Sequence, residues 1–226
     1  MENSKVVILG TAHGVNVLGK RSPDKRLEEY AYSRKVVQEL KRQLEADGLT
    51  VLVDIASDYV PPKQEQELKL RCDIVNALCK KYGKENCIYV SIHVNAAGGD
   101  GKWHMAGGWS AYTSVGETKA DELAECLYEC ARQSLWPYAK AMEECQNNGV
   151  GYDKKQRPFR TDKATDGDSD LEKNFYVLKN TLCPAVLTEN LFMDNKADVD
   201  YLLDPMGFLS IVELHKDGIE TYLGNS

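Results

Sequence analysis

The sequence has 226 residues and a mass of 25.3 kDa, with 42% hydrophobic and 28% charged residues. These proportions are those of a globular protein and exclude a disordered, collagen-like or coiled-coil chain. The length suffices for one sizeable core, so we expect a single domain over residues 1–226 with its core at about 5–223. The formal charge of -7 repels phosphate backbones and anionic lipids, which argues against a nucleic-acid partner.

The N-terminal residues show no targeting or membrane-spanning pattern. Only four consecutive apolar residues, 6–9, follow Lys5, too few for the core of a secretory signal, and no other apolar run approaches bilayer-spanning length. We therefore expect a cytoplasmic protein as synthesised, with no membrane partner and no obligate protein partner. The seven cysteines form no CxxC pair and are odd in number, which favours reduced thiols over a disulfide framework.

The first half of the chain alternates short β-branched runs with longer amphipathic segments. Residues 5–9 (KVVIL) predict a buried strand, and residues 29–44 predict a helix with apolar side chains at helical spacing. Further strands are expected at 49–55 and 87–92, with a helix over 65–81 between them. Strands separated by helices favour a parallel sheet, so the predicted fold class is α/β, a mostly parallel twisted sheet flanked by helices.

The second half of the chain contains two longer loops. A Gly-rich stretch follows Asn95, and residues 145–173 are polar and nearly free of apolar periodicity, which predicts a long loop of the kind that often serves function. The elements expected in this half are a strand at 109–113, a helix from 117 to about 135, strands at 175–178 and 185–188, and a closing helix from about 207 to 223.

Two of the four histidines, His13 and His93, stand just after predicted strands. The carboxyl ends of parallel strands lie on one rim of a sheet, so residues far apart in the sequence can meet there. A single loop histidine usually bonds only its own loop, but two at equivalent strand ends favour a shared metal ion. We therefore predict a zinc site at the carboxyl ends of the strands, where two histidines and one carboxylate leave a fourth position open.

The third ligand must then be an acidic residue. Glu28 and Glu29 both open the helix that follows the His13 loop, and spacing alone does not choose between them, since acidic residues favour a helix N-terminus in any case. Glu189 ends a predicted buried strand on the same rim, where a charge is costly unless it is used or paired. A carboxylate in that position can act as general base and acid in metal-assisted amide hydrolysis.

Several short motifs follow one another in a specific order. The first predicted strand leads into GTAHG at 10–14, SIHVN occupies 91–95, and FYVL at 175–178 precedes PAVLTE at 184–189. Arg71 lies in the helix before SIHVN. In this order the chain resembles the zinc-dependent N-acetylmuramoyl-L-alanine amidases of the Amidase_3 type, with their GHG, SIHxN, FxVL and PAVLxE segments. It departs from them after the last glutamate, where Asn-Leu-Phe replaces a hydrophobic residue, Gly and Phe.

This resemblance, over about residues 6–223, implies a zinc hydrolase with one Zn²⁺ per chain. The implied reaction is hydrolysis of the amide between N-acetylmuramic acid and L-alanine in peptidoglycan or muropeptide fragments. The matched motifs imply His13, Glu29 and His93 as the zinc ligands and Glu189 as the catalytic carboxylate, so Glu29 is chosen over Glu28 by resemblance alone.

Four further residues are candidates for substrate or supporting contacts. Asn95 and Arg71 belong to matched motifs, while His104 and Arg160 lie in the two polar loops. Two alternative functions remain open, namely a zinc peptidase or other amidohydrolase on free peptides and a wall-binding module without turnover. The expected settings are a phage lysin that reaches the cell wall on lysis, a host autolysin, or a cytosolic enzyme that recycles wall fragments.

Overall fold

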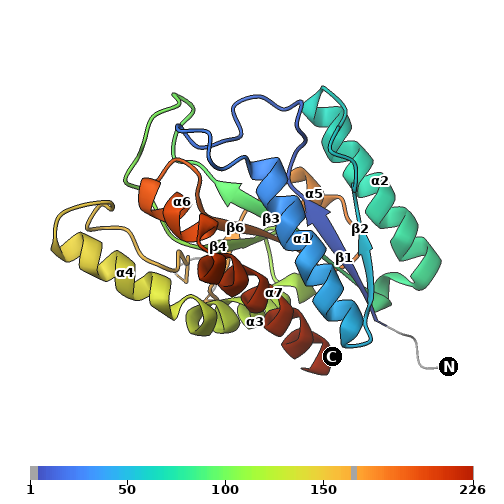
Figure 1. The fold of residues 1–226 in the computed structure, drawn as a ribbon. Helices are drawn as coiled ribbons and strands as arrows, with labels where there is room; N and C mark the ends of the chain where they lie inside the picture. The colour runs from blue at the N-terminus through green and yellow to red at the C-terminus, as the bar shows by residue number, and fades with distance from the viewer. Residues whose placement is uncertain (1–4, 164–166, 226) are drawn as a thin grey trace.

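A six-stranded sheet runs through the middle of the molecule (Figure 1). The computed structural model describes residues 5–163 and 167–225. The strands are β1 (Val6–Thr11), β2 (Thr50–Val53), β3 (Cys87–Asn95), β4 (Ser110–Thr113), β5 (Leu171–Glu172) and β6 (Ala185–Phe192). They lie in the order β2-β1-β3-β6-β4-β5; the first four are parallel, and β4 runs antiparallel to β6. The predicted α/β class with a mostly parallel sheet is confirmed.

Helices cover both faces of this sheet. They are α1 (Glu29–Ala46), α2 (Gln64–Tyr82), α3 (Lys119–Ser134), α4 (Trp136–Asn147), α5 (Tyr176–Lys179), α6 (Lys196–Leu203) and α7 (Pro205–Asn225), with a short 3₁₀ turn at Lys84–Asn86. Residues of α1, α3 and α7 pack together in one core, and residues of α2 and α5 pack in a second one. None of the described helices is both long and apolar enough to span a bilayer.

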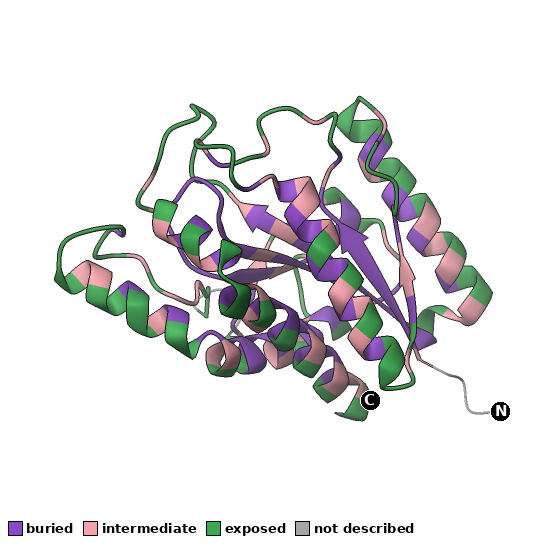
Figure 2. Ribbon diagram, viewed as in Figure 1, coloured by how far each residue is buried: buried purple, intermediate pink, exposed green. Residues whose placement is uncertain are grey.

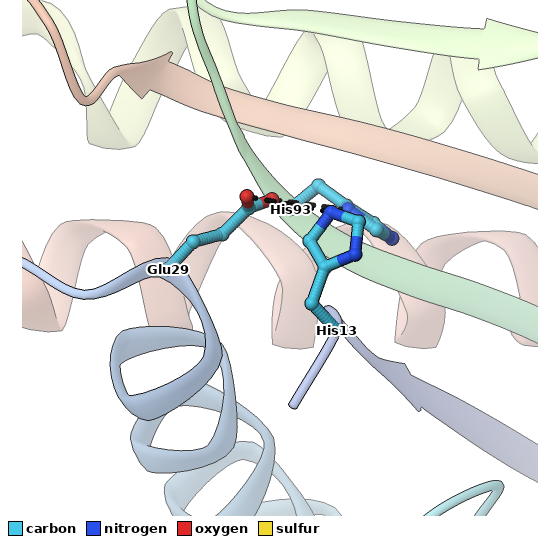
Figure 3. Close-up of side chains that lie close together, drawn as sticks. All are labelled: His13, Glu29 and His93. Carbon is cyan, nitrogen blue, oxygen red and sulfur yellow. Dashed lines mark hydrogen bonds and ion pairs between the residues drawn. The ribbon is translucent and has the colours of Figure 1, made fainter. Parts of the chain in front are cut away.

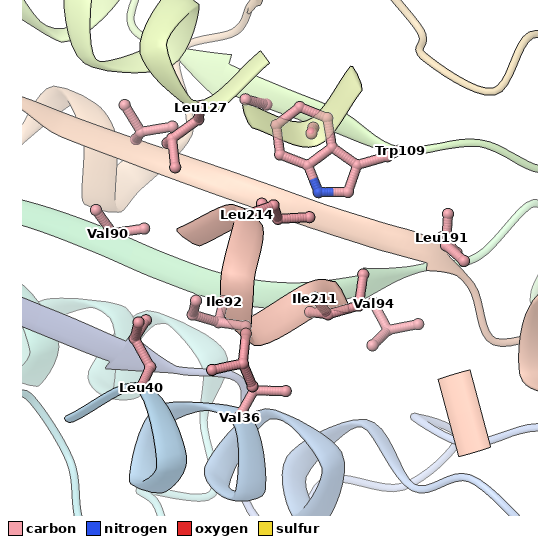
Figure 4. Packing of buried hydrophobic residues seen from close by; sticks show 14 of the residues in the cluster. Val36, Leu40, Val90, Ile92, Val94, Trp109, Leu127, Leu191, Ile211 and Leu214 are labelled. Atoms are coloured by element: carbon pink, nitrogen blue, oxygen red, sulfur yellow. The ribbon is translucent and has the colours of Figure 1, made fainter. Parts of the chain in front are cut away.

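Successive side chains of the central strands pack alternately into the two cores. In β1, Val7 and Leu9 belong to the larger core and Val6 and Ile8 to the smaller one, as the alternation of side chains along a strand requires. Figure 4 shows the larger core, where α1 and α7 approach the side chains of β3. Because both faces are covered, the inner strands are buried along nearly their whole length (Figure 2), which explains their continuous apolar sequence.

Three predicted strands extend further than expected, and the first of them, expected at 5–9, continues to Thr11. The run expected at 87–92 continues to Asn95, and the run expected at 185–188 continues to Phe192. Glu189 therefore lies inside β6 and pairs with His93 of β3, instead of standing at the strand end. The alternating polar side chains in these last residues hid the continuation, because a polar residue inside a buried strand is read as its end.

The strand predicted at 175–178 is wrong, because this segment forms helix α5. Lys179 donates its main-chain N–H to the oxygen of Phe175 at 3.0 Å, and Val177 and Leu178 pack into the smaller core. Both of these neighbouring side chains are buried, as happens in one helical turn. A run of four apolar and aromatic residues is too short for its period to distinguish a helix from a strand.

The long loop predicted at 145–173 is partly wrong. Helix α4 extends to Asn147, and Leu171–Glu172 form β5 beside β4; residues 164–166 lie outside the described residues. Helix α6 was also not predicted, although Asn195 caps it by accepting the main-chain N–H groups of Ala197 and Asp198. An Asn before a helix is a recognised start signal, but eight residues give the periodicity little weight.

Candidate metal centre

Side chains of His13, Glu29 and His93 gather at the carboxyl ends of β1 and β3 (Figure 3). One donor atom from each lies within 4.8 Å of the others. His93 Nδ1 is 3.1 Å from Glu29 Oε1, and His13 Nε2 is 3.5 Å from Glu29 Oε2. Glu29 belongs to this group and Glu28 does not. These three residues therefore meet at the edge of the sheet where the sequence predicts a metal site.

The chain around each of these side chains is held from several sides. Glu29 is the first residue of α1, and its main-chain N–H donates to the oxygen of Lys20 at 2.9 Å. His13 has a φ of 41°, in the left-handed region that costs a residue with a side chain about 1–3 kcal/mol. Its main-chain oxygen accepts hydrogen bonds from Arg34 at 3.0 Å and Arg71 at 3.3 Å, which compensate for this strained conformation.

The electrostatic state of the group suits metal ligation. Burial lowers the pKa of His93, against the opposing effect of the Glu29 carboxylate, so the imidazole is neutral at physiological pH. Burial acts to raise the pKa of Glu29, but the hydrogen bond with His93 and the nearby histidines outweigh it, and that pKa is lowered. Neutral imidazole and ionised carboxylate are the forms that bind a metal ion.

The donor set fits a zinc ion. Two imidazole nitrogens and one carboxylate oxygen form a known catalytic zinc set with room for a fourth ligand. Glu29 Oε2 is buried and accepts no hydrogen bond from any described residue. A buried, charged oxygen without a donor is costly, and a cation between it and the two imidazoles would remove that cost.

Glu189 lies next to this group on the neighbouring strand. It pairs with His93 across β3 and β6, and it lines a cavity of about 160 Å³ together with His13 and His93. Its Oε2 atom is buried without a hydrogen-bond partner among the described residues. Burial, followed by the charge of Glu29, raises the pKa of Glu189 well above its usual range. A carboxyl group in this state can carry a proton near neutral pH.

A buried ionic network supports the His13 side of the site. Arg71 Nη1 lies 2.7 Å from Asp54 Oδ2 and its Nη2 lies 3.0 Å from Glu67 Oε1, with the Arg71 side chain only 2% exposed. Asp54 also accepts the main-chain N–H of Thr11 at 3.0 Å, at the end of β1. Sequence reasoning singled out Arg71 but missed Asp54 and Glu67. The available signal was an acidic residue inside a run predicted to be a buried strand.

The other predicted residues do not belong to the group formed by His13, Glu29 and His93. Asn95 ends β3, and its main-chain oxygen accepts the N–H of Met193 at 2.8 Å. Arg160 places its guanidinium 5.0 Å from the centre of the Phe192 ring. His104 Nε2 lies 2.9 Å from Asp100 Oδ1 in the loop that follows β3.

Taken with the fold, a carboxylate and two imidazoles beside a buried carboxyl group at one rim of an α/β sheet define a metal-dependent hydrolase. The family model of N-acetylmuramoyl-L-alanine amidases, Amidase_3, matches residues 7–221, and the chain belongs to this family. Its activity is therefore that of a peptidoglycan N-acetylmuramoyl-L-alanine amidase. Comparison with curated protein sequences gave no match.

Solved structures of amidases share the fold over nearly the whole chain. An N-acetylmuramoyl-L-alanine amidase from Clostridium difficile 630 superposes with a TM-score of 0.71 at 21% identity, covering 100% of both chains. The catalytic domain of CwlV from Bacillus (Paenibacillus) polymyxa var. colistinus gives 0.69 at 20% identity, covering 98% of this chain and 99% of that one. The CwlD amidase from Clostridioides difficile, solved in complex with the GerS lipoprotein, gives 0.68 at 20% identity, covering 99% and 100%.

Proposed function

We propose that the chain cleaves the amide between the lactyl group of N-acetylmuramic acid and L-alanine with one zinc ion per chain. His13, Glu29 and His93 would hold the ion, and Glu189 would be the acid and base of the reaction. The observation that supports this assignment is the pairing of Glu189 with His93 across adjacent strands, which puts an unpartnered carboxyl beside the three candidate ligands. The substrate would be peptidoglycan or its muropeptide fragments.

Each protein group has a defined part in this reaction. His13, Glu29 and His93 would hold a zinc ion, which would supply a Lewis acid to polarise the amide carbonyl and lower the pKa of a water molecule. Glu189 accepts a proton from the attacking water as the new carbon–oxygen bond forms. The same carboxyl then donates the proton to the alanine nitrogen as the carbon–nitrogen bond breaks, which leaves a lactyl carboxylate and a free amine.

The surroundings of Glu189 favour this double role. Its Oε2 atom is buried without a hydrogen-bond partner among the described residues, so no other described group competes for the proton that it takes from water. The Arg71 network fixes the main chain of His13, so this ligand keeps its direction during turnover.

Mass spectrometry of muropeptides incubated with the zinc-loaded protein tests the proposal. The expected products are an intact stem peptide with a free alanine amine and a glycan with a lactyl carboxylate. Cleavage only within free peptides would instead establish a zinc peptidase. Sedimentation with cell walls and no new amino termini would establish a wall-binding module, and either result would contradict the proposed amidase reaction.

A further inference from the structure

A second cavity, of about 310 Å³, lies between two loops that flank the metal centre. One side comes from the loop that precedes α1, including Arg21 and Lys25, and the other from the loop that follows β3, including Lys102. Figure 1 shows these two loops side by side above the carboxyl ends of the strands. Neither the metal centre nor the proposed proton transfer uses this cavity.

The cavity continues from the elements that carry the candidate site residues. Lys20 lies between two lining residues, its main-chain oxygen accepts the N–H of Glu29, and its charge acts on both Glu29 and Glu189. On the other side, the lining residue Ala96 directly follows β3, and the lining residue Asp194 lies two residues beyond β6. Both sides of the cavity therefore belong to segments that lead directly from the elements of the candidate site.

The charge available in the cavity is positive. Arg21, Lys25 and Lys102 line it and are exposed, and in the described part of the chain no carboxylate lies within ion-pair distance of any of the three. By contrast, the adjacent Arg26 is paired with Asp24 and Asp200, each at 2.6 Å. The chain as a whole has a formal charge of -7. These three unpaired cations nevertheless create a local positive potential that attracts anions.

The single carboxylate in the lining does not neutralise this charge directly. Asp194 is buried, and its oxygens accept the main-chain N–H groups of Ala97 at 2.8 Å and Gly98 at 2.9 Å. It therefore acts as a clamp for the loop that follows β3. In the opposite loop, Ser22 donates its main-chain N–H to the oxygen of Leu27 at 2.8 Å. Because main-chain hydrogen bonds hold both loops, their backbone would need little ordering to bind an anion.

We propose that this cavity binds a carboxylate of the stem peptide while the amide to be cleaved lies at the metal centre. The proposal rests on the proposed function, because it is the amidase reaction that presents a peptide to this rim. Residues that follow L-alanine in a stem peptide bear free side-chain or terminal carboxylates, and guanidinium and ammonium groups are their natural partners. The cavity thus selects peptides with free carboxylates over peptides in which they are amidated.

The test compares two muramyl peptides that differ only in whether their carboxylates are free or amidated. With the zinc-loaded full chain, we expect the triple variant R21Q/K25Q/K102Q to raise KM for the free-acid substrate about tenfold and to leave kcat within about twofold. KM for the amidated substrate should not change. The control variant K80Q/K81Q/K84Q removes the same charge near the start of β3, at the opposite rim, and should leave both KM values unchanged.

Several results would overturn the proposal. If the unsubstituted protein had equal KM values for the two substrates, the cavity would not recognise the free carboxylate. If KM for the free-acid substrate rose equally in the control variant, the effect would come from the overall charge of the protein and not from this cavity. Tighter binding of inorganic phosphate than of the free stem peptide, measured by calorimetry, would assign the cavity to a phosphate.

The same calorimetry separates this proposal from the proposed function. Binding of the stem peptide, which is a product of the reaction, requires no turnover. If no muramyl peptide is cleaved, the amidase proposal fails, yet loss of stem-peptide binding in the triple variant still supports the cavity. If cleavage proceeds and the triple variant binds the stem peptide as well as the unsubstituted protein, only the cavity assignment fails.

Discussion

Asn190 donates a hydrogen bond from its side-chain Nδ2 to the main-chain oxygen of His93 at 3.0 Å. This bond crosses from β6 to β3 where their register shifts, between His93 and Asn95. The Asn190 Oδ1 atom accepts the indole N–H of Trp109 at 2.9 Å, and the whole residue is buried. One amide side chain therefore connects strand β6, which carries Glu189, to strand β3, which carries His93.

Replacing Asn190 by Leu preserves most of the volume and removes these hydrogen bonds. The indole N–H of Trp109 and the oxygen of His93 then lose their partner, which costs about 1–3 kcal/mol in the free energy of unfolding. Urea denaturation followed by circular dichroism measures the change. The exposed Asn148→Leu is the control and should shift the free energy by less than about 0.5 kcal/mol. An Asn190→Leu variant as stable as the unsubstituted protein would show that leucine packing replaces the amide fully.

The pH dependence of stability should reflect the titration of His215 in α7. This histidine is fully buried, its Nδ1–H donates to the oxygen of Ile211 at 2.7 Å, and its Nε2 accepts from the Thr188 hydroxyl at 2.8 Å. Burial lowers the pKa of His215 from 6.5 to about 4. The unfolded chain therefore takes up a proton as pH falls below 6.5, whereas the folded chain does not until about pH 4.

The contribution of His215 to stability is consequently complete above pH 6.5 and is lost as pH falls toward 4, by up to about 3 kcal/mol. Carboxylates titrate in part of this range, so the measurement is the difference between the unsubstituted protein and His215→Gln. The variant should lose less stability than the unsubstituted protein over that interval. Parallel pH profiles would contradict the assignment of the buried, neutral histidine.

Metal content should distinguish the two neighbouring glutamates. Glu29→Ala removes a carboxylate from the group of three and should leave far less than one zinc per chain after dialysis, because two imidazoles hold zinc poorly. Glu28→Ala is the matched control and should retain about one zinc per chain. Elemental analysis of both variants decides the matter, and the reverse pattern would mean that Glu28 is the ligand.

Glu189→Gln should separate metal binding from catalysis. Glutamine keeps the size of the side chain but cannot accept the proton of the attacking water, so kcat on a muramyl peptide should fall about 10² to 10⁴-fold. Zinc content and thermal stability should stay close to those of the unsubstituted protein, which is the internal control. A near-normal kcat in the zinc-loaded variant would remove Glu189 from the proton transfer.

Much of the site was predictable because it follows from the parallel sheet. His13 follows β1 and His93 lies in the last part of β3, whose apolar beginnings the sequence marks clearly, and parallel strands bring their carboxyl ends together. The choice between Glu28 and Glu29 was not predictable from spacing. It depends on where the extended chain at Glu28, with φ -111° and ψ 121°, turns into α1, and a shift by one residue redirects the side chain by about 100°.

The basic cavity lay beyond sequence reasoning for a different reason. Arg21 and Lys102 come from loops without periodicity, and only the folded chain brings these loops together. Helices α5 and α6 were also hard to predict, because they contain too few residues to show the helical spacing of apolar side chains. Helix α4 was not predicted either, although its sequence carries a better signal, a proline in the first turn and apolar Tyr138 and Met142 one turn apart.

The position of β6 in the middle of the sheet also sets an order in which the site can form as the chain is synthesised. β6 pairs with β3 on one side and with β4 on the other, although it is the last strand to be made. His13, Glu29 and His93 all precede it, so a growing chain can gather its metal ligands before Glu189 exists. Until β6 arrives, the apolar edge of β3 has no partner on that side and is open to mispairing. In the proposed mechanism, the carboxyl group that transfers the proton is therefore synthesised after all three candidate metal ligands.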